Sequence, residues 1–304
     1  MYHDPVLLNE SIAFLQLKPE SLVVDVTFGG GGHSAAILKE LGDKGRLFAF
    51  DQDADARKNA EQAPFQGAEN FHFIQSNFRH LKRQLRALGI VPGSIDGLLA
   101  DLGVSSYQFD TPDRGFSYRF DAPLDMRMDA EGEGGADFVL NTYSADSLQN
   151  ILSIYGEVRN ARTLAQAIVK QRDQHPFKTT GDLVAICDTW YMGDRLRYLS
   201  QVFQALRMEV NEEVSVLEDL LREAMEVLKP GGRLVVISYH SIEDRLVKNF
   251  LKSGNAQGEL DKDFYGNIHR PFKLITKKAV TASEEEIKRN PRARSAKLRT
   301  GEKT

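Results

Sequence analysis

Three aspartates, each in or at the end of a short apolar run, are the residues best suited to binding a small molecule. Asp25 lies in the run LVVDV just before the glycines Gly29–Gly32, Asp51 closes RLFAFD, and Asp101 closes IDGLLAD. Glycines let a ligand approach the backbone closely, and carboxylates accept hydrogen bonds from hydroxyl and ammonium groups. This pattern predicts a site for an adenosine-bearing ligand at the edge of a parallel sheet.

Strands and helices alternate around these aspartates in the pattern of a parallel sheet. Strands are predicted at 22–26, 46–50, 71–75, 95–102, 234–238, 272–276 and 296–299, with helices at 33–41, 54–63, 79–88 and 211–228. Between 105 and 201 only helices are predicted, at 145–155, 159–172 and 180–191. We therefore expect one α/β domain, residues 1–105 and 206–304, interrupted by a helical insertion at 106–205.

The glycine turn by itself fits more than one cofactor. Gly30, Gly32 and Ala35 satisfy the dinucleotide pattern G-x-G-x-x-G/A, and Asp51 follows at about the expected distance. The lysine of a P-loop is missing. Asp25 would repel the two negative charges of a pyrophosphate, which counts against a nicotinamide cofactor such as NAD.

S-adenosyl-L-methionine carries no phosphate and fits these residues better. Asp25 can receive the ammonium of its methionine end, directly or through a water, unless this carboxylate only caps a turn. The helix start at His33 and Ser34 suits its carboxylate. Asp51 can accept both ribose hydroxyls, and Phe78 can lie near the adenine. We therefore expect S-adenosyl-L-methionine as the cofactor.

The residues that are missing from the sequence limit which classes of methyl acceptor are possible. Methylation at carbon 5 of a pyrimidine needs a cysteine nucleophile, and the only cysteine, Cys187, lies in the predicted insertion. Methylation of a ribose hydroxyl usually needs a lysine base, and no lysine stands at the end of the strand predicted at 95–102. An exocyclic amine needs orientation and hydrogen acceptors, which Asp101, Ser105 and Ser106 can provide. A protein side chain stays open as an acceptor on these grounds.

Composition and charge set further limits. The net charge is −4, no apolar run is long enough for a membrane span, and the start of the chain lacks the pattern of a signal peptide. With one cysteine, neither a disulfide scaffold nor a multi-cysteine metal site is expected. We therefore expect a cytoplasmic protein that binds no membrane and no metal.

Several motifs together span nearly the whole chain: HDPVLLNE, DVTFGGGGHS, DLGVSSYQFD, RGFSY, PLDMRMD, FQALRMEVNEE, LKPGGRLVVISYHSIEDRLVK and NPRARSAKLR. With these motifs the chain resembles one known family, the bacterial ribosomal small subunit methyltransferase H family. The resemblance implies a class I S-adenosylmethionine-dependent methyltransferase: a Rossmann-like, seven-stranded, mostly parallel sheet with an inserted all-helical domain. It implies methylation of N4 of a cytidine in the decoding region of 16S ribosomal RNA.

The resemblance also implies a set of cofactor contacts, which are Gly31, Gly32, His33, Asp51, Phe78, Asp101 and Gln108. Two departures bear on the site. Tyr107 stands where the family usually has proline, so the backbone leading to Gln108 is less fixed. Tyr239 replaces the usual phenylalanine, which is a mild change.

Catalytic and RNA-binding candidates follow from this interpretation. Asp101, Ser105 and Ser106 are candidates to face the target amine, and His240 is a candidate proton shuttle, although a structural histidine and turn-capping serines fit the pattern equally. A base-stacking partner is expected among Tyr107, Phe116, Tyr118 and Tyr239, for which core packing is the alternative. Phosphate contacts are expected from six basic residues, Arg114, Arg119, Arg127, Arg292, Arg294 and Lys297.

Two alternatives remain open at this point. One is a nicotinamide-dependent oxidoreductase that uses the same glycine turn, and the other is a non-catalytic ribosome assembly factor. The partner that we expect is 16S ribosomal RNA within the small ribosomal subunit, bound by a monomer or a weak homodimer.

Overall fold

The computed structural model describes residues 5–261, 265 and 270–304, apart from the side chain of Ser106. The chain forms two compact units. The first, called the sheet unit here, comprises Met1–Gly103 and Val214–Thr304, and the helical unit comprises Val104–Glu213. The second boundary expected from the sequence, between residues 205 and 206, falls inside a helix of the helical unit.

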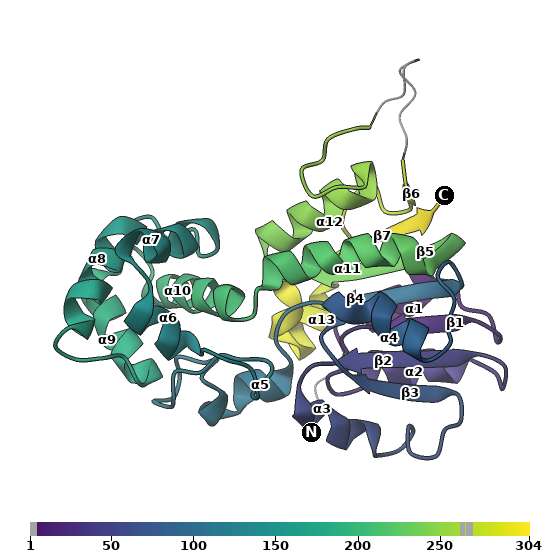
Figure 1. The fold of residues 1–304 in the computed structure, drawn as a ribbon, viewed down its shortest axis with the longest axis horizontal. Coiled ribbons are helices and arrows are strands. Elements are labelled where there is room, and N and C mark those ends of the chain that lie inside the picture. Colours follow the sequence, from purple (N-terminus) through teal and green to yellow (C-terminus); the bar gives the residue numbers. More distant parts are fainter. Residues whose placement is uncertain (1–4, 262–264, 266–269) are drawn as a thin grey trace. The chain divides into compact units, whose positions relative to one another are not determined.

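A seven-stranded sheet forms the centre of the sheet unit, in the order β3-β2-β1-β4-β5-β7-β6 (Figure 1). The strands are β1 Leu22–Asp25, β2 Arg46–Asp51, β3 Phe71–Gln75, β4 Ile95–Asp101, β5 Leu228–Ser238, β6 Phe272–Leu274 and β7 Lys297–Lys303. The first five are parallel, and β7 runs antiparallel to both β5 and β6. This confirms the predicted Rossmann-like class with a mostly parallel sheet.

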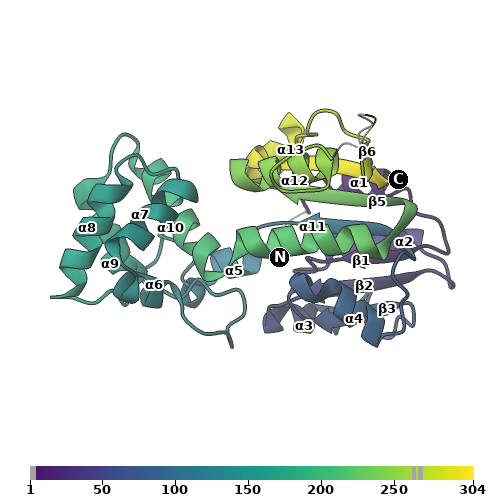
Figure 2. The ribbon, with the colours of Figure 1, turned by 45° about the horizontal axis from the view of Figure 1, so that its top comes forward.

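Helices lie on both faces of this sheet (Figure 2). They are α1 Leu8–Leu15, α2 Gly32–Glu40, α3 Ala54–Ala60, α4 Leu81–Ala87, α11 Glu213–Val227, α12 Ser241–Ser253 and α13 Glu284–Arg289, with 3-10 turns η1 Phe78–His80 and η3 Pro291–Ser295. Alternate strand residues such as Val23, Leu99 and Ile237 share one buried cluster with residues of α1, α2 and η3. Burial on both faces explains why these strands read as continuous apolar runs.

Some element bounds differ from those predicted. The helix expected at 54–63 ends at Ala60, and β5 begins at Leu228 instead of 234. The Pro-Gly-Gly segment at 230–232, between the helix predicted at 211–228 and the strand predicted at 234–238, lies inside β5, where the pairing with β4 shifts register between Ile95 and Gly97. Gly231 has a φ of +79° there, which a glycine adopts without strain. The segment is therefore an irregularity within a strand.

The helical unit contains α5 Ser106–Asp110, α6 Ala136–Thr142, α7 Ala145–Ile154, α8 Ala161–Arg172, α9 Thr180–Trp190 and α10 Arg195–Val210, with η2 Pro112–Arg114. Its core is one cluster to which α6 through α10 contribute. Helix α10 was not among the predicted elements, although Leu199, Val202, Phe203 and Leu206 form its buried stripe at helical spacing. None of the described helices in either unit is both long and apolar enough to cross a membrane.

The turn between β1 and α2 is held from two sides by neighbouring side chains. A Cβ on Gly31 would lie 2.6 Å from a ring carbon of Phe65, and the φ of +78° also favours glycine there. A Cβ on Gly32 would overlap the ring of Pro5. Packing against the protein therefore requires both glycines, independently of any ligand.

We predict that Gly32→Ala destabilises the fold by about 1–3 kcal/mol, because the new methyl group must displace Pro5 and the segment after it. Chemical denaturation of the purified protein measures this change. Lys39→Ala, at an exposed position of the same helix, is the control and should stay within about 0.5 kcal/mol of the parent chain. A Gly32→Ala chain as stable as this control would contradict the packing argument.

Candidate functional site

Asp25 links three segments at the carboxyl end of β1. Its side chain is fully buried, and it accepts hydrogen bonds from the Ser34 hydroxyl at 2.7 Å and from the backbone N–H of Thr27 at 3.0 Å. The Thr27 hydroxyl in turn lies 2.7 Å from the backbone nitrogen of Asp101 and accepts its hydrogen. Burial raises the pKa of Asp25 above its usual range, and the bond from Ser34 opposes that rise. These bonds make Asp25 a turn-capping residue, and a contact with a cofactor stays a prediction.

Asp51 lies at the end of β2, beside the glycine turn. Its carboxylate accepts the backbone N–H of Gly29 at 2.7 Å and that of Asp53 at 2.8 Å. Burial raises its pKa from 3.8 to about 6, and the two backbone bonds limit the rise. A carboxylate offers about four lone-pair sites, so the two oxygens retain capacity for two hydroxyl donors.

Asp101, at the end of β4, lies between a tyrosine and a histidine. The Tyr239 hydroxyl donates a hydrogen bond to Oδ1 at 2.7 Å, and Nδ1 of His33 lies 3.7 Å from Oδ2. The Asp101 side chain is 22% exposed, which leaves it open to a ligand. Burial raises its pKa from 3.8 to about 6, while His33 and the Tyr239 bond lower it.

His33 has a defined tautomer in this arrangement. Its Nε2 lies 3.1 Å from the carbonyl oxygen of Val6, and a carbonyl only accepts, so Nε2 carries hydrogen. The other ring nitrogen, Nδ1, therefore faces Asp101. The sequence predicted His33 as a backbone contact at the helix start, and it did not indicate this side-chain pairing.

Several predicted catalytic and cofactor residues have structural roles. Ser105 and Gln108 form the capping box of α5: the Ser105 hydroxyl accepts the Gln108 N–H at 3.2 Å, and the Gln108 side chain accepts the Ser105 N–H at 3.0 Å. Both belong to the helical unit, and the side chain of Ser106 lies outside the described residues. His240 caps α12, and its Nε2 lies 3.2 Å from Glu243. Their roles in catalysis or cofactor binding stay predictions.

Most of the aromatic candidates for base stacking are packed into the protein. Phe116 is buried in the core of the helical unit, and Tyr118 packs edge-on against Phe203 with ring centroids 5.5 Å apart. Tyr239 packs against the apolar cluster of the sheet unit. Tyr107 is 45% exposed and is the candidate least committed to packing. Phe78 begins η1, three residues beyond the end of β3, and is half-buried.

The six basic candidates fall into two groups: four that are bound to other groups of the protein or half-buried, and two that are exposed. Arg114 donates to the carbonyls of Arg127 and Met128, and Arg127 pairs with Asp125 at 2.6 Å, so both hold the loop in which they lie. Lys297 lies 3.5 Å from Asp244, and Arg292 is half-buried in η3. Arg119 and Arg294 are exposed. These two are the most available for phosphate contacts.

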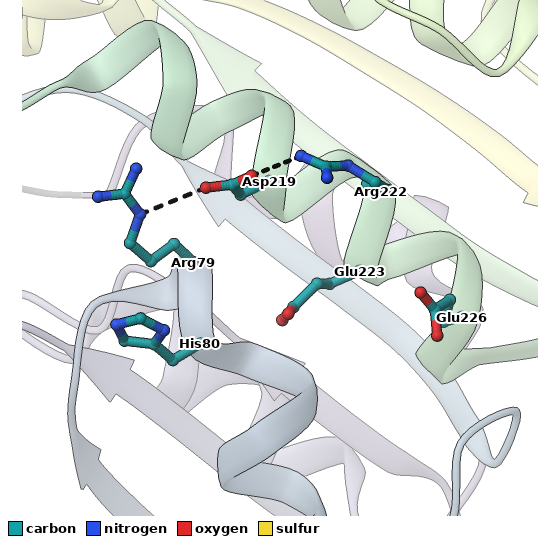
Figure 3. A pocket seen from close by; sticks show the side chains of 6 residues that line it. All are labelled: Arg79, His80, Asp219, Arg222, Glu223 and Glu226. Atoms are coloured by element: carbon teal, nitrogen blue, oxygen red, sulfur yellow. Dashed lines mark hydrogen bonds and ion pairs between the residues drawn. The ribbon is translucent and has the colours of Figure 1, made fainter.

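A pocket of about 260 Å³ lies between η1 and α11 (Figure 3). Asp219 pairs with both Arg79, at 3.3 Å, and Arg222, at 2.5 Å. Glu223 accepts the backbone N–H of Lys82 at 2.7 Å. Because these charged groups already form ion pairs and hydrogen bonds within the protein, we assign the pocket no ligand.

The polar groups at the carboxyl edge of the sheet fit a ligand that carries hydroxyl, ammonium and carboxylate groups. Asp51 and Asp101 provide acceptors at the ends of β2 and β4, and the first turn of α2 provides backbone N–H groups for a carboxylate. The sequence placed these aspartates correctly at strand ends, but it missed Tyr239 as a partner of Asp101. The available signal was that Tyr239 directly follows β5, the neighbour of β4.

Known proteins are similar to this chain along its whole sequence. A model of the MraW methylase family matches residues 1–304. Ribosomal RNA small subunit methyltransferase H of Cytophaga hutchinsonii is 54% identical over 304 residues, covering 100% of both chains. The protein of that name from Parabacteroides distasonis is 50% identical over 303 residues, covering 99% of this chain and 97% of its own.

Among solved structures, TrmN from Thermus thermophilus is similar to the chain at 13% identity with a TM-score of 0.45, covering 98% of this chain and 48% of that one. Nothing about function follows from a similarity at this level. The family match is different in kind, because it extends over residues 1–304, and the two relatives are 50% and 54% identical over almost the same length. The chain therefore belongs to the MraW methylase family, as its motifs predicted, and its methyl donor is S-adenosyl-L-methionine.

Proposed function

We propose that the chain methylates the exocyclic N4 amine of a cytidine in the decoding region of 16S ribosomal RNA, by direct transfer without a covalent intermediate. The names of the relatives at 50% and 54% identity support ribosomal RNA of the small subunit as the substrate class. Membership of a methylase family removes the reason for the nicotinamide alternative. A non-catalytic assembly factor is distinguished by the activity test below.

The observation that carries the proposal is the Asp101 carboxylate, oriented by Tyr239 and partly open at the end of β4. A nucleophilic cysteine, the other device for cytosine methylation, has no counterpart at this edge. Cys187 is fully buried in the core of the helical unit, where burial raises its pKa to about 12. A thiol in such surroundings is unreactive. Direct attack by an amine therefore fits the available groups better.

In-line transfer requires the amine to be oriented and relieved of one proton. A bound donor would supply a methyl group from its sulfonium. The nitrogen–carbon bond would form as the sulfur–carbon bond breaks, so one proton would have to leave the nitrogen. Asp101 can accept the amine's hydrogens before transfer and take up that proton afterwards, because its pKa of about 6 lies near the working pH. The neighbouring His33 lowers the pKa of Asp101 and so opposes the effect of burial.

Three parts of the sheet unit are proposed to hold the donor. Asp51 would accept the ribose hydroxyls, the first turn of α2 at Gly32 and His33 would bind the carboxylate, and Phe78 would lie near the adenine. Asp101 would serve both the donor's ammonium and the target amine. Gln108 and Asp25 stay in the proposed set, with Asp25 acting on the turn through Ser34 and Thr27.

RNA handling is proposed to depend on the exposed basic residues and on the helical unit. Arg119 and Arg294 would contact phosphates, which position a nucleic acid without reading its sequence. The target cytosine would be extruded from its surroundings into the site, with Tyr107 as a candidate stacking partner. The helical unit, Val104–Glu213, would thus be a substrate-recognition domain.

We predict that ribosomal RNA from cells lacking the gene contains no N4-methylated cytidine at the target position, and that the modification returns with the parent gene but not with Asp101→Ala. Mass spectrometry of ribosomal RNA nucleosides measures this. A chain with Lys39→Ala is the control and should restore the modification. Persistence of the modified cytidine in the deletion would refute the acceptor assignment, and full rescue by Asp101→Ala would refute the role of Asp101.

We predict that donor affinity falls as the pH drops through about 6, because Asp51 and Asp101 both have pKa values near 6 and bind the donor as carboxylates. The loss should approach about tenfold per pH unit below 6 for each carboxylate that must lose a proton. Calorimetric titration with S-adenosyl-L-methionine between pH 5.5 and 8, with circular dichroism to verify folding, measures this. Asp51→Asn should bind more weakly at pH 8 and show a shallower fall. Constant affinity over this range is the contrary result.

We predict that Arg119→Ala combined with Arg294→Ala weakens RNA binding and reduces the slope of log affinity against log salt by roughly 0.7–0.9 for each phosphate that is no longer neutralised. A fragment of 16S RNA that contains the decoding region serves as the ligand. Arg222→Ala removes an exposed arginine that pairs with Asp219 and is the matched control. An unchanged salt slope in the double variant would argue against phosphate binding by these two arginines.

A further inference from the structure

The hydroxyl of Tyr239 is bound to the group on which the proposed reaction depends. It donates to Oδ1 of Asp101 at 2.7 Å, from the residue that follows β5 to the last residue of β4. In the sheet, Asp101 pairs with Ile237, so Tyr239 lies two residues beyond the partner of Asp101. The contact is therefore fixed by the register of two neighbouring parallel strands.

We propose that Tyr239 is a positioning residue for methyl transfer, which fixes the Asp101 carboxylate in one orientation and keeps it ionised so that Oδ2 can take up the amine proton. This inference rests on the proposed function, because it assigns a role within the same site. The sequence offered this side chain only as a stacking or packing group. The inference also replaces the expectation that Tyr239, where the family usually has phenylalanine, is a mild change.

The tyrosine ring is held in place from several sides. Its backbone N–H donates to Oε2 of Glu243 at 3.0 Å, which fixes the start of α12. The ring packs against the apolar cluster beneath α1 and α2, and a Cβ on Gly103 would lie 3.5 Å from it. A hydroxyl on a ring held this firmly loses little side-chain entropy when it bonds Asp101. The bond is therefore preorganised in the folded protein.

The charges around Asp101 explain why such a donor matters. Asp25 and Glu243 are acidic and disfavour its ionised form, as does burial, while His33 and the Tyr239 hydroxyl favour it. Burial and the neighbouring Asp101 raise the pKa of Tyr239 well above its usual value, so the phenol remains a donor at every working pH. A hydrogen bond to a carboxylate is stronger than one to the neutral acid. Loss of this bond should therefore shift Asp101 towards its protonated form.

The orientation has a direct chemical consequence. With Oδ1 occupied by Tyr239, Oδ2 is the oxygen that lies near His33, at 3.7 Å from Nδ1. During transfer the amine nitrogen gains a methyl group and loses one proton, which passes to Oδ2 and forms the neutral acid. The neutral acid then returns the proton to water, so that the cycle closes without any further reactant.

The test is the pH profile of Tyr239→Phe, which keeps the ring and removes only the hydroxyl. Single-turnover methyl transfer to small-subunit RNA is measured between pH 5.5 and 9, alongside donor affinity by calorimetry over the same range. We expect the acid limb of the rate to move up by about one pH unit, so that the rate falls several-fold at pH 6.5 and much less at pH 8.5. The acid limb of donor binding should move in the same direction.

Tyr198→Phe is the matched control, because it removes a buried phenol of the helical unit whose hydroxyl donates to Asn160 at 2.9 Å and not to Asp101. Its acid limb should coincide with that of the parent chain. Superimposable profiles for Tyr239→Phe and the parent chain would overturn the proposal. An equal loss of rate at every pH would also overturn it, since a merely structural role predicts that result.

Failure of the proposed function gives a different result from failure of this inference. If the parent chain forms no N4-methylated cytidine but the acid limb of donor binding still shifts in Tyr239→Phe, the acceptor is wrong and the Tyr239–Asp101 link stands. If N4-methylated cytidine forms and neither limb shifts, the acceptor stands and the role of Tyr239 is wrong.

Discussion

The rest of the site depends on the hydrogen bonds that the buried carboxyl group of Asp25 accepts. A carboxyl group with no exposure is costly unless hydrogen bonds satisfy it, and here the Ser34 hydroxyl and the Thr27 backbone do so. Ser34 belongs to α2, and Thr27 also bonds the backbone of Asp101 through its hydroxyl. One side chain therefore ties the start of α2 to the ends of β1 and β4. These bonds hold Asp101 in place relative to Asp25.

The glycine turn has a more specific explanation than closeness to a ligand. Gly31 and Gly32 are each packed against a side chain of the protein, Phe65 on one side and Pro5 on the other. Phe65 belongs to an aromatic group with Phe28 and Phe71, with ring centroids 4.6–5.8 Å apart. The turn therefore packs between an aromatic cluster and the segment before α1. This packing fixes the backbone N–H groups of the first turn of α2 before any ligand arrives.

The buried carboxyl groups of the site reduce the stability of the fold at neutral pH. Burial raises the pKa values of Asp51 and Asp101 from 3.8 to about 6, so the folded state binds these protons more tightly than the unfolded chain does. The two groups therefore favour folding most below pH 4, and this contribution is lost as the pH rises through 6. Above pH 6 the fold retains two partly buried negative charges. Such a cost is typical of groups retained for binding or catalysis instead of for stability.

The sequence by itself determined the sheet class, the family and the aspartates at the strand ends, because buried parallel strands are continuous apolar runs and their carboxyl ends share one edge. It did not determine which side chains meet there. The bond from Tyr239 to Asp101 joins residues 138 positions apart, and it depends on the pairing of β4 with β5. Likewise, only the folded loop shows that Arg127 is bound to Asp125 while Arg119 is exposed. Local patterns carry the period and the ends of elements, whereas the partners of polar side chains are decided by strand register and packing, which only the tertiary structure provides.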